Sequence, residues 1–489
     1  MNIEPSSGSA CVNRLGLSSK PPHYRIDWAE NTLAPRQPLS EADWDTVLGV
    51  MKELRITGLN AQQHMTDRAL ERLAELNHVT KLHLDGSQQV TDAGLQHLRR
   101  MPQLEDLDLC GYRSAITDCG LDVLRHLKQL RKYKMCWPQC VTDRGVANLQ
   151  DCDQLETVNL LGTQSGDGAI KALTGKPGLR LFISGMQVTD AGLPLLHEFP
   201  LFKMWNGGDT EMTLMAFNPD PNFLLLRGPI TEKGLSNLKG LDGLFALNLD
   251  DDKLGVTAAV LRCLAELPQL AFLGCDATDE VMPFIAAMPR LRKLMCQDTK
   301  ASDEGFVALS RSQTIEYIWG RRCYNLQGRG FAALATMPAL RGLVVSCKNV
   351  EDNALSALSR FPALKEFVPM DVPEDGFRHV GQCTQLEALW CMYCKDTGDV
   401  ATGHLAGLTS LKTYAAFSSR ITDQSLKLLG RLPNLERLIF EHCAQITDAG
   451  LASLAALPRL REVRLEGAPL VTPEGAMTFP SHVRVIFED

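Results

Sequence analysis

The sequence predicts an α/β solenoid, horseshoe-shaped, with a parallel β-sheet on its concave face and short helices on its convex face. The first indication is internal repetition: the pattern of "VTDAGLQHLRRMPQLEDLDLCG" at 90–111 returns in "ITDAGLASLAALPRLREVRLEG" at 446–467. The second is a period of 21 to 26 residues, broken by one interval of 42. The third is the order within each unit, a helical pattern followed by a strand pattern.

Seventeen units follow from aligning the position that is most often Thr before Asp. These positions are Thr66, Thr91, Thr117, Thr142, Gly166, Thr189, Thr231, Thr257, Thr278, Ser302, Gln327, Glu351, Pro373, Gly398, Thr422, Thr447 and Thr472. Together they cover the chain from about residue 60 onward, so one repeat array accounts for most of its length.

Each unit predicts a short helix and then a strand. Thr is a good N-cap, and the Asp that follows lies in the first turn, where the helix dipole favours an anion. Leu451 and Leu454 then fall three apart, on one helical face. A proline such as Pro458 ends the helix because it lacks the N–H that a continuing helix needs. The next apolar residues alternate, as expected for a strand with one face buried.

The repeats resemble the cysteine-containing class of leucine-rich repeats, whose pattern runs Leu-x-x-Leu-x-Leu-x-x-Cys-x-x-Ile-Thr-Asp-x-Gly-Leu. Cys443, Cys323 and Cys394 fall on its first cysteine, and Cys152 and Cys383 match a second cysteine before the next strand. The class is familiar from F-box substrate receptors of cullin-type ubiquitin ligases and is similar to repeats in bacterial proteins, including effectors of plant pathogens. The resemblance therefore implies the fold and a recognition role, and we expect a bacterial-type variant.

Composition favours an ordered chain with a protein partner. The 489 residues are 45% apolar and 22% charged with a net charge of −8, so we expect no nucleic acid and no membrane as partner. No apolar run approaches the ~20 residues of a membrane span, and the start lacks a secretory pattern, which predicts a cytoplasmic protein. The 15 cysteines are scattered through the units, so we expect most to be buried and reduced.

Three segments are expected along the chain. Residues 1–39 read as a flexible N-terminal tail, and residues 1–22 could alternatively be a bacterial export signal. Residues 40–59 predict an N-terminal cap made of a Ser-capped amphipathic helix and a first strand, and residues 60–489 the repeat array. An F-box would need a longer three-helix segment, which the sequence does not show.

Motifs for chemistry are weak. Cys391 and Cys394 have zinc-ligand spacing, but no second pair stands nearby and both occupy repeat positions. Gly328 and Gly330 lack the third glycine of a dinucleotide loop, and Asp250 to Asp252 read better as a solvated turn than as a cation site. We therefore expect no enzyme, no metal and no cofactor.

The outward-facing strand residues should line the concave face. In the first half this column reads Asp108, Lys134, Asn159, Phe182, Asn248 and Gly274, which is mostly polar. It then becomes apolar from the tenth unit, and we expect this apolar column to bind a partner. The predicted partner-binding residues are Met295, Trp319, Val344, Val368, Trp390 and Ile439 in the column, with Met392 and Phe417 beside it. The alternatives are that the chain's own tail or loop covers them, or that the column reflects only the β-propensity of its residues.

The interval of 42 holds an insertion at residues 207–223. It opens on glycines and closes on "NPDPN", so it should leave the array as a loop. Its Met212, Leu214, Met215 and Phe217 favour packing on another surface, such as the neighbouring concave wall.

The leading functional hypothesis is a non-catalytic scaffold that binds a protein or peptide on the concave face, as an effector or adaptor. A bacterial effector could be delivered into a host cell. The alternatives are a substrate receptor of a cullin-type ubiquitin ligase and an enzyme with an unrecognised site. The sequence leaves the partner and the oligomeric state open.

Overall fold

The computed structural model describes residues 23–205, 210–249, 254 and 256–488. These residues form two compact units. The first unit contains residues up to 203 together with 224–229, and the second contains residues 204–223 and 230–489. Asp250 to Asp252 and the possible export signal at 1–22 lie outside the described residues.

The first unit alternates strands with short helices. Its strands are β1 (Tyr24–Asp27), β2 (Thr32–Pro35), β3 (Gly58–Asn60), β4 (Lys81–His83), β5 (Asp106–Asp108), β6 (Lys132–Lys134), β7 (Thr157–Asn159) and β8 (Leu181–Ile183), and most of β11 (Phe223–Leu225). Its α-helices are α2 (Glu41–Leu54), α3 (Asp67–Leu73), α4 (Asp92–Leu95), α5 (Asp143–Val146), α6 (Asp167–Leu173) and α7 (Pro200–Lys203). Its 3₁₀ helices are η2 (Gln62–His64), η3 (Gln96–Arg100), η4 (Gly120–His126), η5 (Ala147–Asp151) and η6 (Leu193–Glu198).

The second unit opens with a small hairpin and continues with the same alternation. Its strands are β9 (Glu211–Met212), β10 (Phe217–Asn218), β12 (Ala246–Leu249), β13 (Phe272–Cys275), β14 (Lys293–Met295), β15 (Tyr317–Gly320), β16 (Gly342–Ser346), β17 (Glu366–Met370), β18 (Ala388–Cys391), β19 (Thr413–Phe417), β20 (Arg437–Glu441), β21 (Glu462–Glu466) and β22 (Arg484–Glu488). Its α-helices are α8 (Glu232–Leu235), α9 (Ala258–Leu264), α10 (Met282–Ala286), α11 (Asp303–Leu309), α12 (Gly328–Leu334), α13 (Asp352–Leu355), α14 (Phe377–Val380), α15 (Asp399–His404), α16 (Asp423–Leu429), α17 (Asp448–Ala452) and α18 (Pro473–Ala476). Its 3₁₀ helices are η7 (Ser236–Leu238), η8 (Ser356–Arg360), η9 (Glu374–Gly376) and η10 (Leu405–Gly407).

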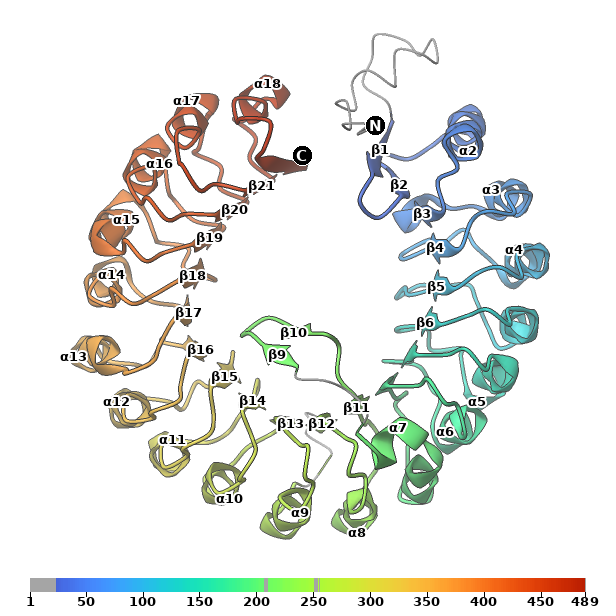
Figure 1. Cartoon of the computed structure of the whole chain (residues 1–489), viewed down its shortest axis with the longest axis horizontal. Helices are drawn as coiled ribbons and strands as arrows, with labels where there is room; N and C mark the ends of the chain where they lie inside the picture. The colour runs from blue at the N-terminus through green and yellow to red at the C-terminus, as the bar shows by residue number, and fades with distance from the viewer. Residues whose placement is uncertain (1–22, 206–209, 250–253, 255, 489) are drawn as a thin grey trace, which may run out of the picture. The chain divides into compact units, whose positions relative to one another are not determined.

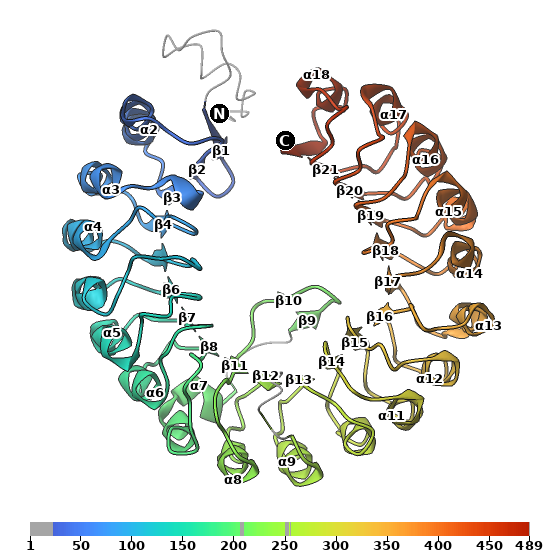
Figure 2. The ribbon, with the colours of Figure 1, turned by 180° about the vertical axis from the view of Figure 1, so that it is seen from behind.

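Within each unit, consecutive repeats place their strands side by side in parallel. This holds from β2 to β8 in the first unit and from β12 to β22 in the second. In both units the strands line the inner side of the curve and the helices the outer side (Figures 1 and 2). The predicted fold class, an α/β leucine-rich repeat solenoid, is confirmed.

The N-terminal end differs from the predicted tail. Strands β1 and β2, within the expected tail 1–39, form an antiparallel hairpin, and β2 then pairs in parallel with β3. Leu33 of this hairpin is fully buried, so the hairpin covers the open edge of the sheet. The cap helix α2 begins at the predicted Ser40, whose side chain forms a capping box with Asp43.

The Thr-Asp motif has a second role that the helix-dipole interpretation missed. In the second unit, Thr447 caps its own helix, while both its backbone N–H and its hydroxyl donate to Asp423 of the preceding repeat, at 2.8 and 2.7 Å. Gly450 leaves room for this carboxylate, because a Cβ there would overlap Asp423 Oδ1. The motif therefore links neighbouring repeats where it is present, as it also does between Asp67 and Thr91 in the first unit.

The thiols lie mostly inside the units. Of the 14 cysteines in the described residues, ten are buried, and only Cys119 and Cys140 are exposed. Cys391 and Cys394, the pair with zinc-ligand spacing, are both buried among repeat core residues. Burial raises the pKa of Cys391 well above its usual value and that of Cys394 to about 11, which disfavours the thiolate form.

Candidate protein-binding face

The strand register of the second unit aligns the apolar column that the sequence predicted. Met295 stands beside Trp319, Trp319 beside Val344, and Val344 beside Val368. The pairing of β17 with β18 carries the column to Trp390, and the next two strands carry it to Ile439. In the first unit, Asn159 aligns with Ile183 rather than with Phe182, which is fully buried, so that member of the predicted polar column was wrong.

Burial divides the predicted partner-binding residues into two groups. Val344 and Val368 have no exposed surface, and Ile439 is also buried. The others are half-buried and so retain surface that a partner could contact: Met295, Trp319, Trp390, Met392 and Phe417. Their role in binding stays a prediction.

The hairpin β9–β10, part of the predicted insertion, covers one stretch of the column. Met212 and Leu214 belong to one buried cluster with Val344 and Val368, and Phe217 packs against it. Both views show the hairpin on the strand side of the second unit, near β14 and β15 (Figures 1 and 2). The predicted packing of the insertion is confirmed for these three hairpin side chains. It was wrong for Met215, which lies at the hairpin tip and is 48% exposed.

Two charged side chains of the sheet hold the main chain of the hairpin tip. The Lys293 ammonium donates to the carbonyls of Thr213 and Leu214, at 3.0 and 2.9 Å. The Glu366 carboxylate accepts the N–H of Leu214 at 3.3 Å. Lys293 also lies 4.9 Å from the centre of the Phe217 ring.

The surroundings of these two groups perturb their pKa values. Burial lowers the pKa of Lys293 to about 8, although the charge of Glu366 partly opposes this shift. Burial raises the pKa of Glu366, while its hydrogen bond from Leu214 and the nearby ammonium oppose the rise. Desolvation is thus the largest cause at both sites.

A glycine leaves room for the Tyr317 and Leu214 side chains. A Cβ on Gly342 would lie 3.2 Å from Leu214 Cδ1 and 2.5 Å from Tyr317 Cδ1. Leu214 has no exposed surface, although it lies at the tip of an inserted hairpin. Gly342, Lys293 and Glu366 each stand two residues before a column member, so they project from the same face of the sheet. This alternation is the signal that could have found them in the sequence.

Beyond the hairpin the face continues with aromatic side chains. The Trp390 and Phe417 rings stack with their centres 6.4 Å apart. The Trp390 indole N–H is buried and has no acceptor within the described residues. Nearby, the Arg321 guanidinium donates to the Tyr393 hydroxyl and lies over its ring, and Tyr393 is 45% exposed. This stretch combines apolar area with polar groups, as binding surfaces commonly do.

The inner face of the first unit has a different character. Its column carries polar and charged residues that pair with their neighbours, such as Lys134 with Asp108 at 3.4 Å and His83 with Asp106 at 3.3 Å. A polar hollow of about 410 Å³ lies beside His83 and Asp108. This face offers hydrogen-bonding groups but no continuous apolar area.

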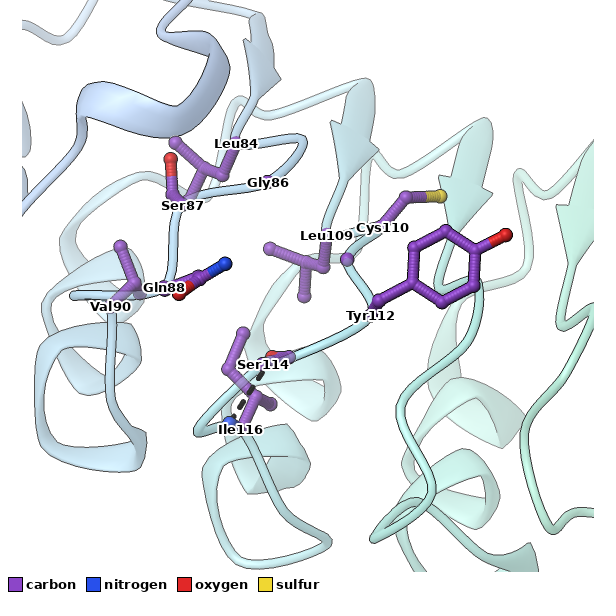
Figure 3. A pocket seen from close by; sticks show the side chains of 11 residues that line it. Leu84, Gly86, Ser87, Gln88, Val90, Leu109, Cys110, Tyr112, Ser114 and Ile116 are labelled. Atoms are coloured by element: carbon purple, nitrogen blue, oxygen red, sulfur yellow. Dashed lines mark hydrogen bonds between the residues drawn. The ribbon is translucent and has the colours of Figure 1, made fainter.

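A second hollow in the first unit is too small for a ligand. Figure 3 shows it between the turns that follow β4 and β5, with Leu84 and Leu109 among its walls. Its volume of about 20 Å³ would hold a single water molecule. Tyr112 at its rim stacks on Trp137, with ring centres 5.0 Å apart.

Comparison with known proteins agrees with these repeats. Residues 431–455 match the family model described as Leucine Rich repeat. The chain is built from leucine-rich repeats. No curated protein matches the sequence.

Three solved structures are similar to this chain at low sequence identity. An internalin from Listeria monocytogenes is 15% identical over 86% of this chain and 93% of its own, with a TM-score of 0.28. A chain of the yeast Rad7 and Elc1 complex is 16% identical over 91% and 93%, with a TM-score of 0.37. A chain of the TLR13–ssRNA13 complex is 15% identical over 95% and 67%, with a TM-score of 0.40.

In the described parts of the chain, no helix combines the length and the apolar character that crossing a membrane requires. The same residues contain no group of three or more metal-ligating side chains placed to hold an ion.

Proposed function

We propose that this protein is a non-catalytic scaffold that binds another protein on the inner face of its second unit. The observation that carries the proposal is the aligned apolar column, which continues past the hairpin as Trp390, Met392 and Phe417. Half-buried aromatic side chains in a row of parallel strands match the composition of binding hot spots. A protein or peptide fits this apolar stretch better than a nucleic acid, whose phosphates favour basic surfaces.

Within this proposal we favour an effector or adaptor role, with a substrate receptor of a cullin-type ligase as the alternative. In the described residues before β3 the only α-helix is α2. That helix packs as a cap, with Trp44 and Met51 fully buried. The cytoplasmic location stays a prediction.

The test is the binding of a partner captured from the source organism and then purified. Replacing Trp390 and Phe417 together with Ala should raise the Kd at least 30-fold, since hot-spot truncations cost ~2 kcal/mol or more each. The control replaces Asp108, Lys134 and Asn159 in the polar column, which removes little apolar area. Circular dichroism would establish that both variants fold. Equal losses of binding from the two sets would refute the assignment of this face.

A further inference from the structure

The hairpin β9–β10 is held by groups that recognise main chain rather than a particular sequence. Lys293 contributes its ammonium to two consecutive carbonyls, and Glu366 contributes its carboxylate to one N–H. Any polypeptide turn with free carbonyl and N–H groups could make the same three hydrogen bonds. The sheet therefore has a binding arrangement whose present occupant is a segment of the same chain.

The only strongly selective feature is the space for one aliphatic side chain. Gly342 is the first residue of β16, and a glycine in a strand often marks the close approach of another group. A Cβ there would meet the Tyr317 ring at 2.5 Å and Leu214 Cδ1 at 3.2 Å, so the glycine leaves room for both side chains, and Leu214 has no exposed surface. A turn that replaced the hairpin would need leucine, or a side chain of similar size and polarity, at the same point.

The hairpin itself is a small element that is loosely built. Its strands have two residues each, and its turn closes through two hydrogen bonds of 3.0 Å, from Thr213 N–H to the Ala216 carbonyl and from Ala216 N–H to the Thr213 hydroxyl. An isolated two-stranded hairpin is marginally stable in water. Its order thus depends on docking against the sheet, and segments of this kind open more easily than the core repeats.

The docked hairpin adjoins the surface assigned to the partner. Val368, beneath the hairpin cluster, aligns with Trp390 on the next strand, and Met370 pairs with Met392. Neighbouring strands lie only ~4.8 Å apart. A partner bound over Trp390 and Phe417 would therefore reach the hairpin site within two or three strands.

We propose that the hairpin at residues 211–218 is a tethered competitor, and that the surface beneath it binds a turn of the partner protein that presents a leucine side chain. This inference rests on the proposed function and specifies the partner segment. The partner's turn would place leucine against Gly342 and its main chain between Lys293 and Glu366. The tether gives the hairpin a high effective concentration, so the site stays closed until a partner also engages the aromatic stretch.

The experiment uses the full chain with Leu214→Asp, which sets a carboxylate in an apolar space and should release the hairpin. The matched control is Met215→Asp, which introduces the same charge one residue along, at an exposed position. The probe is a fluorescein-labelled cyclic peptide that contains residues 210–218, TEMTLMAFN. Binding is measured by fluorescence anisotropy, and thermal unfolding establishes that each variant is folded.

We expect the peptide to bind the Leu214→Asp variant at least tenfold more tightly than it binds the wild type or the Met215→Asp variant. A peptide with Asp in place of its leucine should not bind. The inference is overturned if the folded Leu214→Asp variant fails to bind the peptide, or if it binds no better than the wild type. The peptide could fail to bind the Leu214→Asp variant while the Trp390 and Phe417 substitutions still weaken partner binding. That result would refute this inference and leave the proposed function supported.

Discussion

Replacing Leu214 with Ala should loosen the hairpin while leaving the repeats intact. The substitution removes three carbon atoms from a side chain without exposed surface, which at ~0.8 kcal/mol per carbon lowers the free energy of docking by about 2.4 kcal/mol. An opening equilibrium changes about tenfold for every ~1.4 kcal/mol, so amide exchange in the hairpin should accelerate about 50-fold. The global free energy of unfolding should change much less, because the repeats do not need the hairpin to stack.

The assay is hydrogen–deuterium exchange over residues 210–218, combined with urea unfolding. The Thr213 and Leu214 amides report opening, since their acceptors are Ala216 and Glu366. Met215→Ala is the control and should stay within ~0.5 kcal/mol, as surface substitutions usually do. The reasoning is refuted if Leu214→Ala lowers global stability by the ~2 to 5 kcal/mol of a core truncation while the hairpin amides exchange only with global unfolding.

Three further outcomes follow from the contacts. The pKa of Lys293 is about 8 in the folded protein and 10.5 ordinarily, so the unfolded chain binds more protons between these values and stability rises with pH. The free energy of unfolding in urea should therefore be higher at pH 10 than at pH 8 in the wild type, and this difference should disappear in Lys293→Met. An equal difference in both proteins would contradict the prediction. Gly450→Ala should destabilise the chain less when Asp423 is already Ala, because the added Cβ then meets no carboxylate. A double-mutant cycle in unfolding free energy measures this coupling, and additive losses from the two substitutions would exclude the contact. Iodoacetamide followed by peptide mapping should modify Cys119 and Cys140 before the buried cysteines, and rapid labelling of the buried thiols would overturn this order.

The fold was predictable because the repeat period and the local signals agree. Thr447 predicts the start of a helix, and the structure begins α17 after it. The role of Asp423 as a link between repeats was not predictable from one unit alone, since its acceptor atoms face a residue 24 positions later. The N-terminal hairpin was missed because β1 and β2 lie outside the period, and only pairing with the sheet reveals their register.

The apolar column was predictable because alternation fixes which strand residues share a face. The same rule would have identified Lys293 and Gly342, two residues before Met295 and Val344. Nothing in the sequence says that Leu214, which lies 79 residues before Lys293, contacts both of them. The apolar content of the hairpin indicated packing, yet its register on the sheet decides that Leu214 is enclosed and Met215 exposed. Such long-range pairings depend on tertiary structure, which local patterns do not encode.

The contrast between the two inner faces supports a binding role for the second. In the first unit, charged residues of adjacent strands satisfy one another, as Lys134 and Asp108 do, so a partner would have to replace interactions that already exist. In the second unit, the charged groups of Lys293 and Glu366 instead form hydrogen bonds with the main chain of the hairpin. A buried lysine with a lowered pKa is a costly way to hold a loop, because an apolar residue would dock the hairpin without that desolvation. The arrangement makes physical sense if the groups that hold the hairpin also serve a second polypeptide.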